Sequence, residues 1–211
     1  MLTERELRER MAMHGKSLYD RGLTPGSSGN LSVRLPDGML ITPTNSCLGR
    51  LDPDEISRLD SQGRLRSGKP PSKEVFLHQA YYDSRSRESA VVHLHSTWSV
   101  AVSCLADVDP DNVLPAITAY YVMRVGRLPL IPYFAPGDLD LAAAVADASR
   151  AARSVLLANH GPVVGGTDLD AAVYAAEELE ETAKLHLILR SLPARFLTAD
   201  QQAELHRRFP S

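Results

Sequence analysis

The chain has 211 residues, of which 44% are hydrophobic and 23% are charged, and its formal net charge at pH 7 is −3. This length fits a single domain over residues 1–211 with a substantial core, and this charge gives no electrostatic basis for binding nucleic acid or an anionic membrane. No apolar run approaches the roughly 20 residues that span a bilayer, and the charged N-terminus lacks the apolar core of a signal peptide. The two cysteines are isolated, which favours a reducing compartment. A cytoplasmic protein is therefore expected.

Helical and extended patterns alternate along the chain. Apolar spacing and capping residues predict helices over residues 3–20, 52–55, 73–82, 98–105, 138–150, 168–190 and 198–208. Apolar runs and turn residues predict strands over residues 31–35, 39–41, 91–94, 128–132 and 154–158. Strands that interleave with helices indicate a layered α/β sandwich. In the longest helix, the glutamates at 177, 178, 180 and 181 are expected on a solvated face.

Two histidines one residue apart interrupt the apolar run Val91-Val92-His93-Leu94-His95. In an extended strand, alternate side chains point to the same face, so His93 and His95 would lie side by side. Neutral imidazoles in this arrangement are suited to ligate one divalent metal. The alternative is that one histidine packs in the core and the other lies on the surface at the strand end.

A third histidine and a glutamate extend this hypothesis. His160 follows the apolar strand 154–158, where loops at strand ends commonly carry functional side chains, although it could also simply terminate the strand. Three histidines would leave a coordination position open, as in catalytic zinc sites. Glu74 lies in the first turn of a predicted helix, where it acts either as a dipole-stabilising residue or as an acid/base near the metal. His78, four residues further along, would be either a supporting partner or an ordinary helix residue.

Several turns rich in small polar residues offer hydrogen-bond donors of the kind that bind phosphate. They are Gly29-Asn30, the loop Thr42-Pro43-Thr44-Asn45-Ser46 and the helix start Ser72-Lys73. Each is weak by itself, because turns are made of such residues in any case.

Five segments together resemble the class II aldolases of the fuculose-phosphate aldolase/adducin superfamily. They are Gly29-Asn30-Leu31-Ser32, Ile41-Thr42-Pro43-Thr44, Gly68-Lys69-Pro70-Pro71-Ser72-Lys73-Glu74, Val91-Val92-His93-Leu94-His95-Ser96 and Asn159-His160-Gly161. Motifs that agree in order and spacing are far more specific than any one of them. The resemblance implies a three-layer α/β/α sandwich with a central mixed, largely antiparallel sheet.

The resemblance also implies a site and an assembly. One Zn2+ per subunit, or another divalent metal, would be held by His93, His95 and His160, with Glu74 as acid/base and as a ligand when substrate is absent. The substrate phosphate would be held by Gly29, Asn30, Thr44, Asn45, Ser72 and Lys73. Either Tyr120 or Tyr121 would donate a proton or contact substrate in a neighbouring subunit's site, within a homotetramer.

Local departures indicate which reaction is expected. Fuculose-phosphate aldolases tend to carry glycine and serine where this chain has Asn45 and Lys73. The segments around these residues, with 120–126 and 175–184, look like 3-oxo-tetronate 4-phosphate decarboxylases. That resemblance implies loss of CO2 from a small phosphorylated keto-sugar acid, through a metal-stabilised enediolate, to give dihydroxyacetone phosphate. The alternatives are a class II sugar-phosphate aldolase of the fuculose- or ribulose-phosphate type, or a non-catalytic adducin-type binding module.

Overall fold

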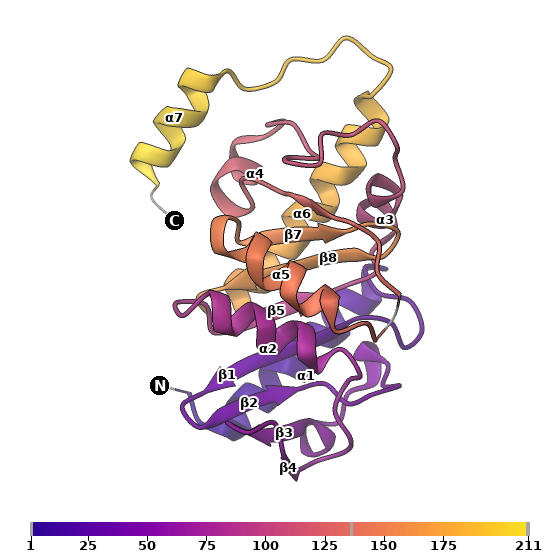
Figure 1. The fold of residues 1–211 in the computed structure, drawn as a ribbon, viewed down its shortest axis with the longest axis vertical. Helices are drawn as coiled ribbons and strands as arrows, with labels where there is room; N and C mark the ends of the chain where they lie inside the picture. Colours follow the sequence, from indigo (N-terminus) through magenta and orange to yellow (C-terminus); the bar gives the residue numbers. More distant parts are fainter. Residues whose placement is uncertain (1, 136, 210–211) are drawn as a thin grey trace.

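The computed structural model describes residues 2–135 and 137–209 of the chain. Its centre is one eight-stranded sheet in the order β4-β3-β2-β1-β5-β8-β7-β6 (Figure 1). The strands are β1 (Asn30–Leu35), β2 (Gly38–Ile41), β3 (Ser57–Asp60), β4 (Leu65–Ser67), β5 (Ala90–His93), β6 (Leu130–Ile131), β7 (Ser154–Leu157) and β8 (Gly161–Gly166). Every neighbouring pair is antiparallel except β6 and β7, which are parallel. The prediction of a mixed, largely antiparallel sheet is therefore confirmed.

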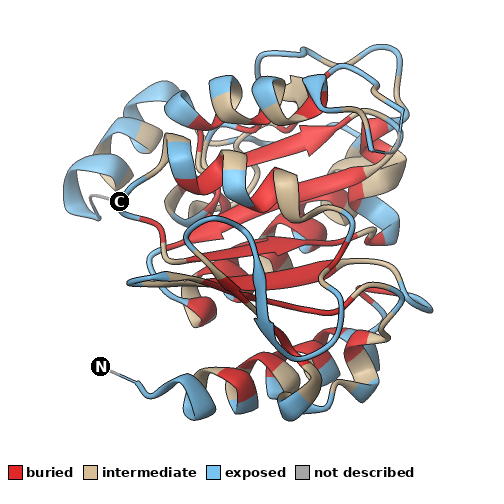
Figure 2. Ribbon diagram, turned by 60° about the horizontal axis from the view of Figure 1, so that its bottom comes forward, coloured by how far each residue is buried: buried red, intermediate tan, exposed pale blue. Residues whose placement is uncertain are grey.

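Helices cover both faces of this sheet. They are α1 (Glu4–Asp20), α2 (Val75–Ser84), α3 (Thr97–Ser103), α4 (Ala119–Arg124), α5 (Asp140–Ala151), α6 (Leu169–Leu189) and α7 (Ala199–Arg208), with short 3-10 turns at Leu48–Arg50 and Pro53–Glu55. The helices α2 and α5 pack against one face, and α1, α3, α4 and α6 pack against the other. In Figure 2 the strands of the central sheet are largely buried, whereas the outer sides of the helices are exposed. The three-layer prediction is also confirmed.

Alternation along the strands divides the core into two clusters. Val91 and Val163 point toward α2 and α5, whereas Val92 and Val164 point toward α6. Successive strand residues face opposite sides of a sheet, so these apolar pairs fill both interfaces at once. This explains why β5 and β7 appear in the sequence as continuous apolar runs.

The sequence did not predict β3, β4, β8 or α4. The sequence of β8 does not indicate a strand, because four of its six residues are glycine or proline, which are rare in strands. In the structure, glycine is needed there for close approach: a Cβ at Gly165 would overlap the hydroxyl of Tyr81, and one at Gly161 would overlap the carbonyl of Leu94. Tertiary contacts therefore override the weak strand propensity of this segment.

The expectation that Glu180 lies on a solvated face is wrong. Its side chain is buried and accepts hydrogen bonds from the backbone N–H groups of Trp98 and Ser99, both at 2.8 Å, and from the Ser99 hydroxyl at 2.6 Å. These donors lie in the first turn of α3, where backbone N–H groups have no partner within the helix. Glu180 therefore anchors the helix that begins two residues after His95.

The last helix lies apart from the sheet. None of the residues of α7 is buried, and the helix contacts α4 (Figure 1). Among the helices of residues 2–135 and 137–209, none combines the length and apolar character that a bilayer crossing requires.

Candidate metal and substrate site

Three strands end at the same edge of the sheet. Both β5 and β7 are antiparallel to β8, so they run in the same direction, and β6 is parallel to β7. The residues that follow these strands therefore emerge together, which brings His93 and His95 beside His160. The first residue of β1, Asn30, pairs with His93 and lies at the same edge.

Four side chains form a compact cluster at this edge, made of Glu74, His93, His95 and His160. The Nε2 atoms of His93 and His95 are 3.1 Å apart, those of His95 and His160 are 3.1 Å apart, and those of His93 and His160 are 3.3 Å apart. The carboxylate of Glu74 lies 3.5 Å from His93 Nε2 and 3.3 Å from His160 Nε2. All four residues proposed as metal ligands are thus brought together.

The position of His95 does not follow from strand alternation, which was the basis of its prediction. The strand β5 ends at His93, and His95 lies in the irregular segment between β5 and α3. The imidazole of His95 reaches the cluster from this segment. His95 lies in the cluster that was expected to hold the metal, but its place there depends on the irregular segment before α3.

The ring of His93 is held in one tautomer. Its Nδ1 lies 2.9 Å from the carbonyl oxygen of Pro162, which can only accept, so Nδ1 carries the hydrogen and the Nε2 lone pair faces the cluster. Burial, assisted by His160 and His95, lowers the pKa of His93 to about 4 even though Glu74 opposes this shift. Burial also lowers the pKa of His95. Neutral imidazoles are the form that binds metals.

The donor set fits a divalent metal. The three Nε2 atoms lie within 3.3 Å of one another, and nitrogen lone pairs this close repel unless a proton or a metal ion lies between them. Two nitrogens bound tetrahedrally to zinc at about 2.0–2.1 Å lie about 3.3 Å apart, close to the separations found here. A carboxylate oxygen completes a set of four ligand atoms that all lie within 4.8 Å of one another.

Glu74 occupies the N-cap position of α2 but makes no capping hydrogen bond with its side chain. Its Oε2 instead accepts a hydrogen bond of 2.7 Å from Asn30 Nδ2. Burial favours the protonated form of Glu74, but the electrostatic influence of His93 and the hydrogen bonds from His160 and Asn30 outweigh it and hold the pKa of Glu74 well below its usual value. The dipole-stabilising interpretation therefore does not describe what this side chain contacts.

A cavity of about 650 Å³ opens beside the cluster and is lined by His95, His160, Asn159, Thr97, Val100, Tyr133 and Phe134. This volume suits a small substrate. The sequence prediction missed Tyr133, whose side chain is 64% exposed. The one feature that could have indicated Tyr133 is its position after β6, which is parallel to β7. Residues that follow parallel strands emerge at the same edge of the sheet, here the edge with the cluster.

The segments proposed to bind phosphate are partly assembled. Thr44 N–H donates to the Pro70 carbonyl and Ser72 N–H donates to the Thr42 carbonyl, so the two loops lie side by side. Thr44 and Asn45 line a cavity of about 460 Å³, together with Arg50 and Lys69.

The remaining residues of that set lie around Glu74. Ser72 is buried, and its hydroxyl accepts from the backbone N–H of Glu74, whereas Lys73 is exposed. Gly29 has a φ of 78° and passes close to the carbonyl of His93. The Asn30 side chain contacts Glu74.

The two tyrosines on α4 differ in exposure. Tyr121 is 2% exposed, and its hydroxyl finds no hydrogen-bond partner among the described residues. Tyr120 is 60% exposed, with the guanidinium of Arg124 5.5 Å from its ring centroid. Neither tyrosine lines the 650 Å³ cavity of the same chain, within the part that the structure describes.

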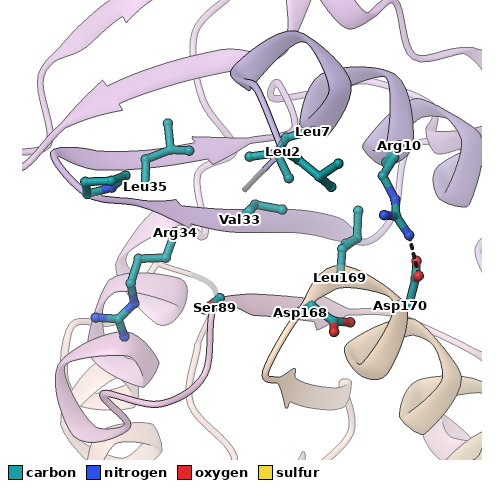
Figure 3. A pocket seen from close by; sticks show the side chains of 11 residues that line it. Leu2, Leu7, Arg10, Val33, Arg34, Leu35, Ser89, Asp168, Leu169 and Asp170 are labelled. Carbon is teal, nitrogen blue, oxygen red and sulfur yellow. Dashed lines mark hydrogen bonds and ion pairs between the residues drawn. The ribbon is translucent and has the colours of Figure 1, made fainter.

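A third cavity, of about 520 Å³, lies at the opposite end of β1 from Asn30 (Figure 3). It is lined mainly by Leu2, Leu7, Val33, Leu35 and Leu169, with the Arg10–Asp170 ion pair at one side. None of the four cluster residues is among the residues that line it.

Comparison with known proteins gives close relatives along nearly the whole chain. The 3-oxo-tetronate 4-phosphate decarboxylase of Escherichia coli (strain K12) is 52% identical over 203 residues, which cover 96% of each chain. The Haemophilus influenzae protein of the same name is 46% identical over 208 residues, covering 98% of this chain and 99% of the relative. An L-fuculose phosphate aldolase of the same species is 36% identical over 173 residues, covering 81% of this chain and 77% of the relative.

Solved structures show the same relationship. The protein YgbL of Klebsiella pneumoniae, whose description reads aldolase/epimerase/decarboxylase, superposes with a TM-score of 0.94 at 47% identity, covering 97% of this chain and 100% of that one. An L-fuculose 1-phosphate aldolase superposes with a TM-score of 0.86 at 27% identity, covering 98% and 97%. The model of the class II aldolase and adducin N-terminal domain matches residues 9–187. The chain therefore belongs to the class II aldolase and adducin family.

Proposed function

We propose that this protein is a zinc-dependent carbon–carbon lyase that decarboxylates 3-oxo-tetronate 4-phosphate to dihydroxyacetone phosphate and CO2. The observation that carries the proposal is the full-length similarity to decarboxylases of this name at 46–52% identity, against 33–37% for the aldolases. The intact cluster of three histidines and Glu74 supports an enzyme over a binding module.

His93, His95 and His160 would hold the zinc ion, with Glu74 as a fourth ligand when substrate is absent. A bound divalent metal supplies Lewis acidity, which stabilises negative charge on substrate oxygens as the carbon–carbon bond breaks. Glu74, ionised and directed at the same point, is placed to take a proton from a water molecule and pass it to the product carbon after CO2 leaves. The cavity beside His95 and His160 would hold the sugar-acid part of the substrate.

Phosphate recognition would fall to the loops around Glu74. Main-chain and side-chain donors of Gly29, Asn30, Thr44, Asn45, Ser72 and Lys73 would form this site, of which Thr44 and Asn45 line a cavity that also has the cationic Arg50 and Lys69. Tyr120, exposed on α4, would reach the site of a neighbouring subunit in a homotetramer.

We further infer that residues 1–211 form a single domain, because one sheet contains strands from both halves of the chain.

The deciding experiment supplies purified, zinc-loaded protein with 3-oxo-tetronate 4-phosphates and, separately, with ketose 1-phosphates that undergo retro-aldol cleavage. Release of CO2 together with a triose phosphate is expected from the first set. Release of aldehyde from the second set without CO2 from the first would establish the aldolase alternative and refute the decarboxylase.

Glu74→Gln tests the proposed proton carrier. Loss of a general acid/base typically costs about 10²–10⁴-fold in rate, so kcat should fall by that factor. Zinc content must be measured in the same preparation, since Glu74 is also a candidate ligand. Full activity of a zinc-loaded variant would show that the proton takes another route.

A further inference from the structure

A row of polar side chains lies behind Glu74, between α2 and β1. Helix α2 and its N-cap supply Glu74, His78 and Tyr82 at intervals of four residues, and β1 supplies Asn30 and Ser32 at an interval of two. Four helical residues rise about 6.0 Å and two strand residues rise about 6.6 Å, so side chains from one element fit between those of the other.

Hydrogen bonds connect the whole row. Asn30 Nδ2 lies 2.7 Å from Glu74 Oε2, and Asn30 Oδ1 lies 2.5 Å from His78 Nε2. His78 Nδ1 lies 2.6 Å from Ser32 Oγ, which in turn lies 2.7 Å from the hydroxyl of Tyr82. His78 and Ser32 are completely buried, and Tyr82 and Asn30 are 3% and 4% exposed. Partners this deeply buried are costly to lose, because water cannot replace them.

The chemistry of the groups fixes the direction of every bond. The amide oxygen of Asn30 can only accept, so His78 Nε2 carries the hydrogen. Burial lowers the pKa of His78 to about 3, so the ring is neutral and its Nδ1 accepts from the Ser32 hydroxyl. Ser32 then accepts from Tyr82, whose pKa burial raises. Each donor therefore points along the row toward the carboxylate of Glu74.

We propose that His78 is a positioning residue, which orients the amide of Asn30 and thereby the carboxylate of Glu74. Rotation of the Asn30 amide by a half-turn would set its carbonyl oxygen against the carboxylate of Glu74, which can only accept. The carboxylate therefore fixes the amide with its NH2 group toward Glu74 and its oxygen toward the Nε2–H of His78. The catalytic consequence of this positioning rests on the role proposed for Glu74 above; the hydrogen-bonded row itself does not.

The first test requires no substrate. In metal-free protein labelled with 15N-histidine, long-range 1H–15N spectra should show one ring in the Nε2–H tautomer that stays neutral between pH 5 and pH 8. The resonance belongs to His78 if it is absent from His78→Gln. An Nδ1–H tautomer, or a ring that titrates near its ordinary pKa, would overturn the proposal.

The second test separates positioning from stability. His78→Leu removes the donor to Asn30, whereas His78→Gln keeps an amide N–H near the position of Nε2. Loss of a partner behind a metal ligand typically costs about 10–100-fold, so His78→Leu should lower kcat and apparent zinc affinity by such factors, with KM changed less than about two-fold. His78→Gln should recover about ten-fold or more of the loss in kcat. Equal kcat in the wild type and His78→Leu, or no recovery in His78→Gln, would overturn the proposal.

A matched pair of tyrosines covers the case in which His78→Leu does not fold. Tyr82 and Tyr81 are adjacent and buried on α2, and each donates one hydrogen bond of 2.7 Å, Tyr82 to the row and Tyr81 to the carbonyl of Arg153 outside it. Tyr82→Phe should lower kcat by about two- to ten-fold and shift the His78 nitrogen resonances, whereas Tyr81→Phe should change neither. The same response from both variants would show that the row has only a structural role.

These readouts also distinguish this inference from the proposed function. If wild-type protein turns over no keto-sugar phosphate, the proposed function fails, and the tautomer and zinc-affinity measurements still decide whether the row positions Glu74. If wild-type protein is active but the tautomer is Nδ1–H, the inference about His78 fails alone.

Discussion

Glu180→Gln gives the sharpest test of how α6 supports the site. The buried carboxylate of Glu180 accepts two backbone N–H bonds at 2.8 Å and a hydroxyl bond at 2.6 Å at the start of α3. Glutamine keeps one carbonyl oxygen, which can face Ser99 and preserve two of these bonds. The NH2 group then meets the N–H of Trp98, so the variant loses one charge-assisted bond and leaves a donor without an acceptor. We expect a loss of about 2–4 kcal/mol in the free energy of unfolding.

For a chain of this length, such a loss corresponds to a fall of about 4–16 °C in the unfolding temperature. The matched control is Glu181→Gln on the exposed side of the same helix, which should stay within about 0.5 kcal/mol of the wild type. Urea unfolding followed by circular dichroism, with both variants metal-free, measures the difference. A Glu180→Gln protein as stable as Glu181→Gln would refute the capping role.

Three further predictions concern the cluster, the buried histidine and a close contact in the sheet. Zinc should raise the unfolding temperature of metal-free protein, because it binds only the folded chain. Differential scanning fluorimetry should show no such rise in His160→Ala. The control variant His206→Ala, on exposed α7, should show the full rise. Burial in the folded chain lowers the pKa of His78 from its ordinary value of 6.5 to about 3, so only the unfolded chain takes up this proton between those pH values. As the pH decreases, the free energy of unfolding of metal-free wild type should therefore fall more steeply than that of His78→Gln, by up to about 1.4 kcal/mol per pH unit. Urea denaturation at a series of pH values measures both free energies. The same pH dependence in the two proteins would contradict this prediction. Gly165→Ala should cost about 1–3 kcal/mol, because its Cβ would overlap the Tyr81 hydroxyl, and a double-mutant cycle with Tyr81→Phe should show partial recovery.

The sequence predicted the candidate metal cluster better than it predicted the backbone that builds it. His93, His95 and His160 were recognisable because they lie in two of the five segments that together resemble the class II aldolases. The strand that aligns them, β8, was not predicted, because its glycines are selected by contacts with Tyr81 and Leu94 that only the folded chain contains. Local propensity carries no information about such contacts.

Glu180 shows a second limit of sequence patterns. Its neighbours along α6 are Glu177, Glu178 and Glu181, and a run of glutamates normally marks a solvated helix face. Its partners are backbone N–H groups of α3, which carry no sequence signature. A buried carboxylate can be stable there because a helix N-terminus offers both unpaired donors and a favourable dipole.

The row of polar side chains behind Glu74 could be predicted only in part. The spacing of its residues along α2 and β1 is visible in the sequence, but the alignment of the helix with the strand is not. Glu74, His78 and Tyr82 repeat every four residues, and Asn30 and Ser32 repeat every two. The two repeats differ by about 0.6 Å per step, so a helix and a strand that match at one end drift apart by more than 1 Å after two steps. Such a row can therefore be only a few side chains long.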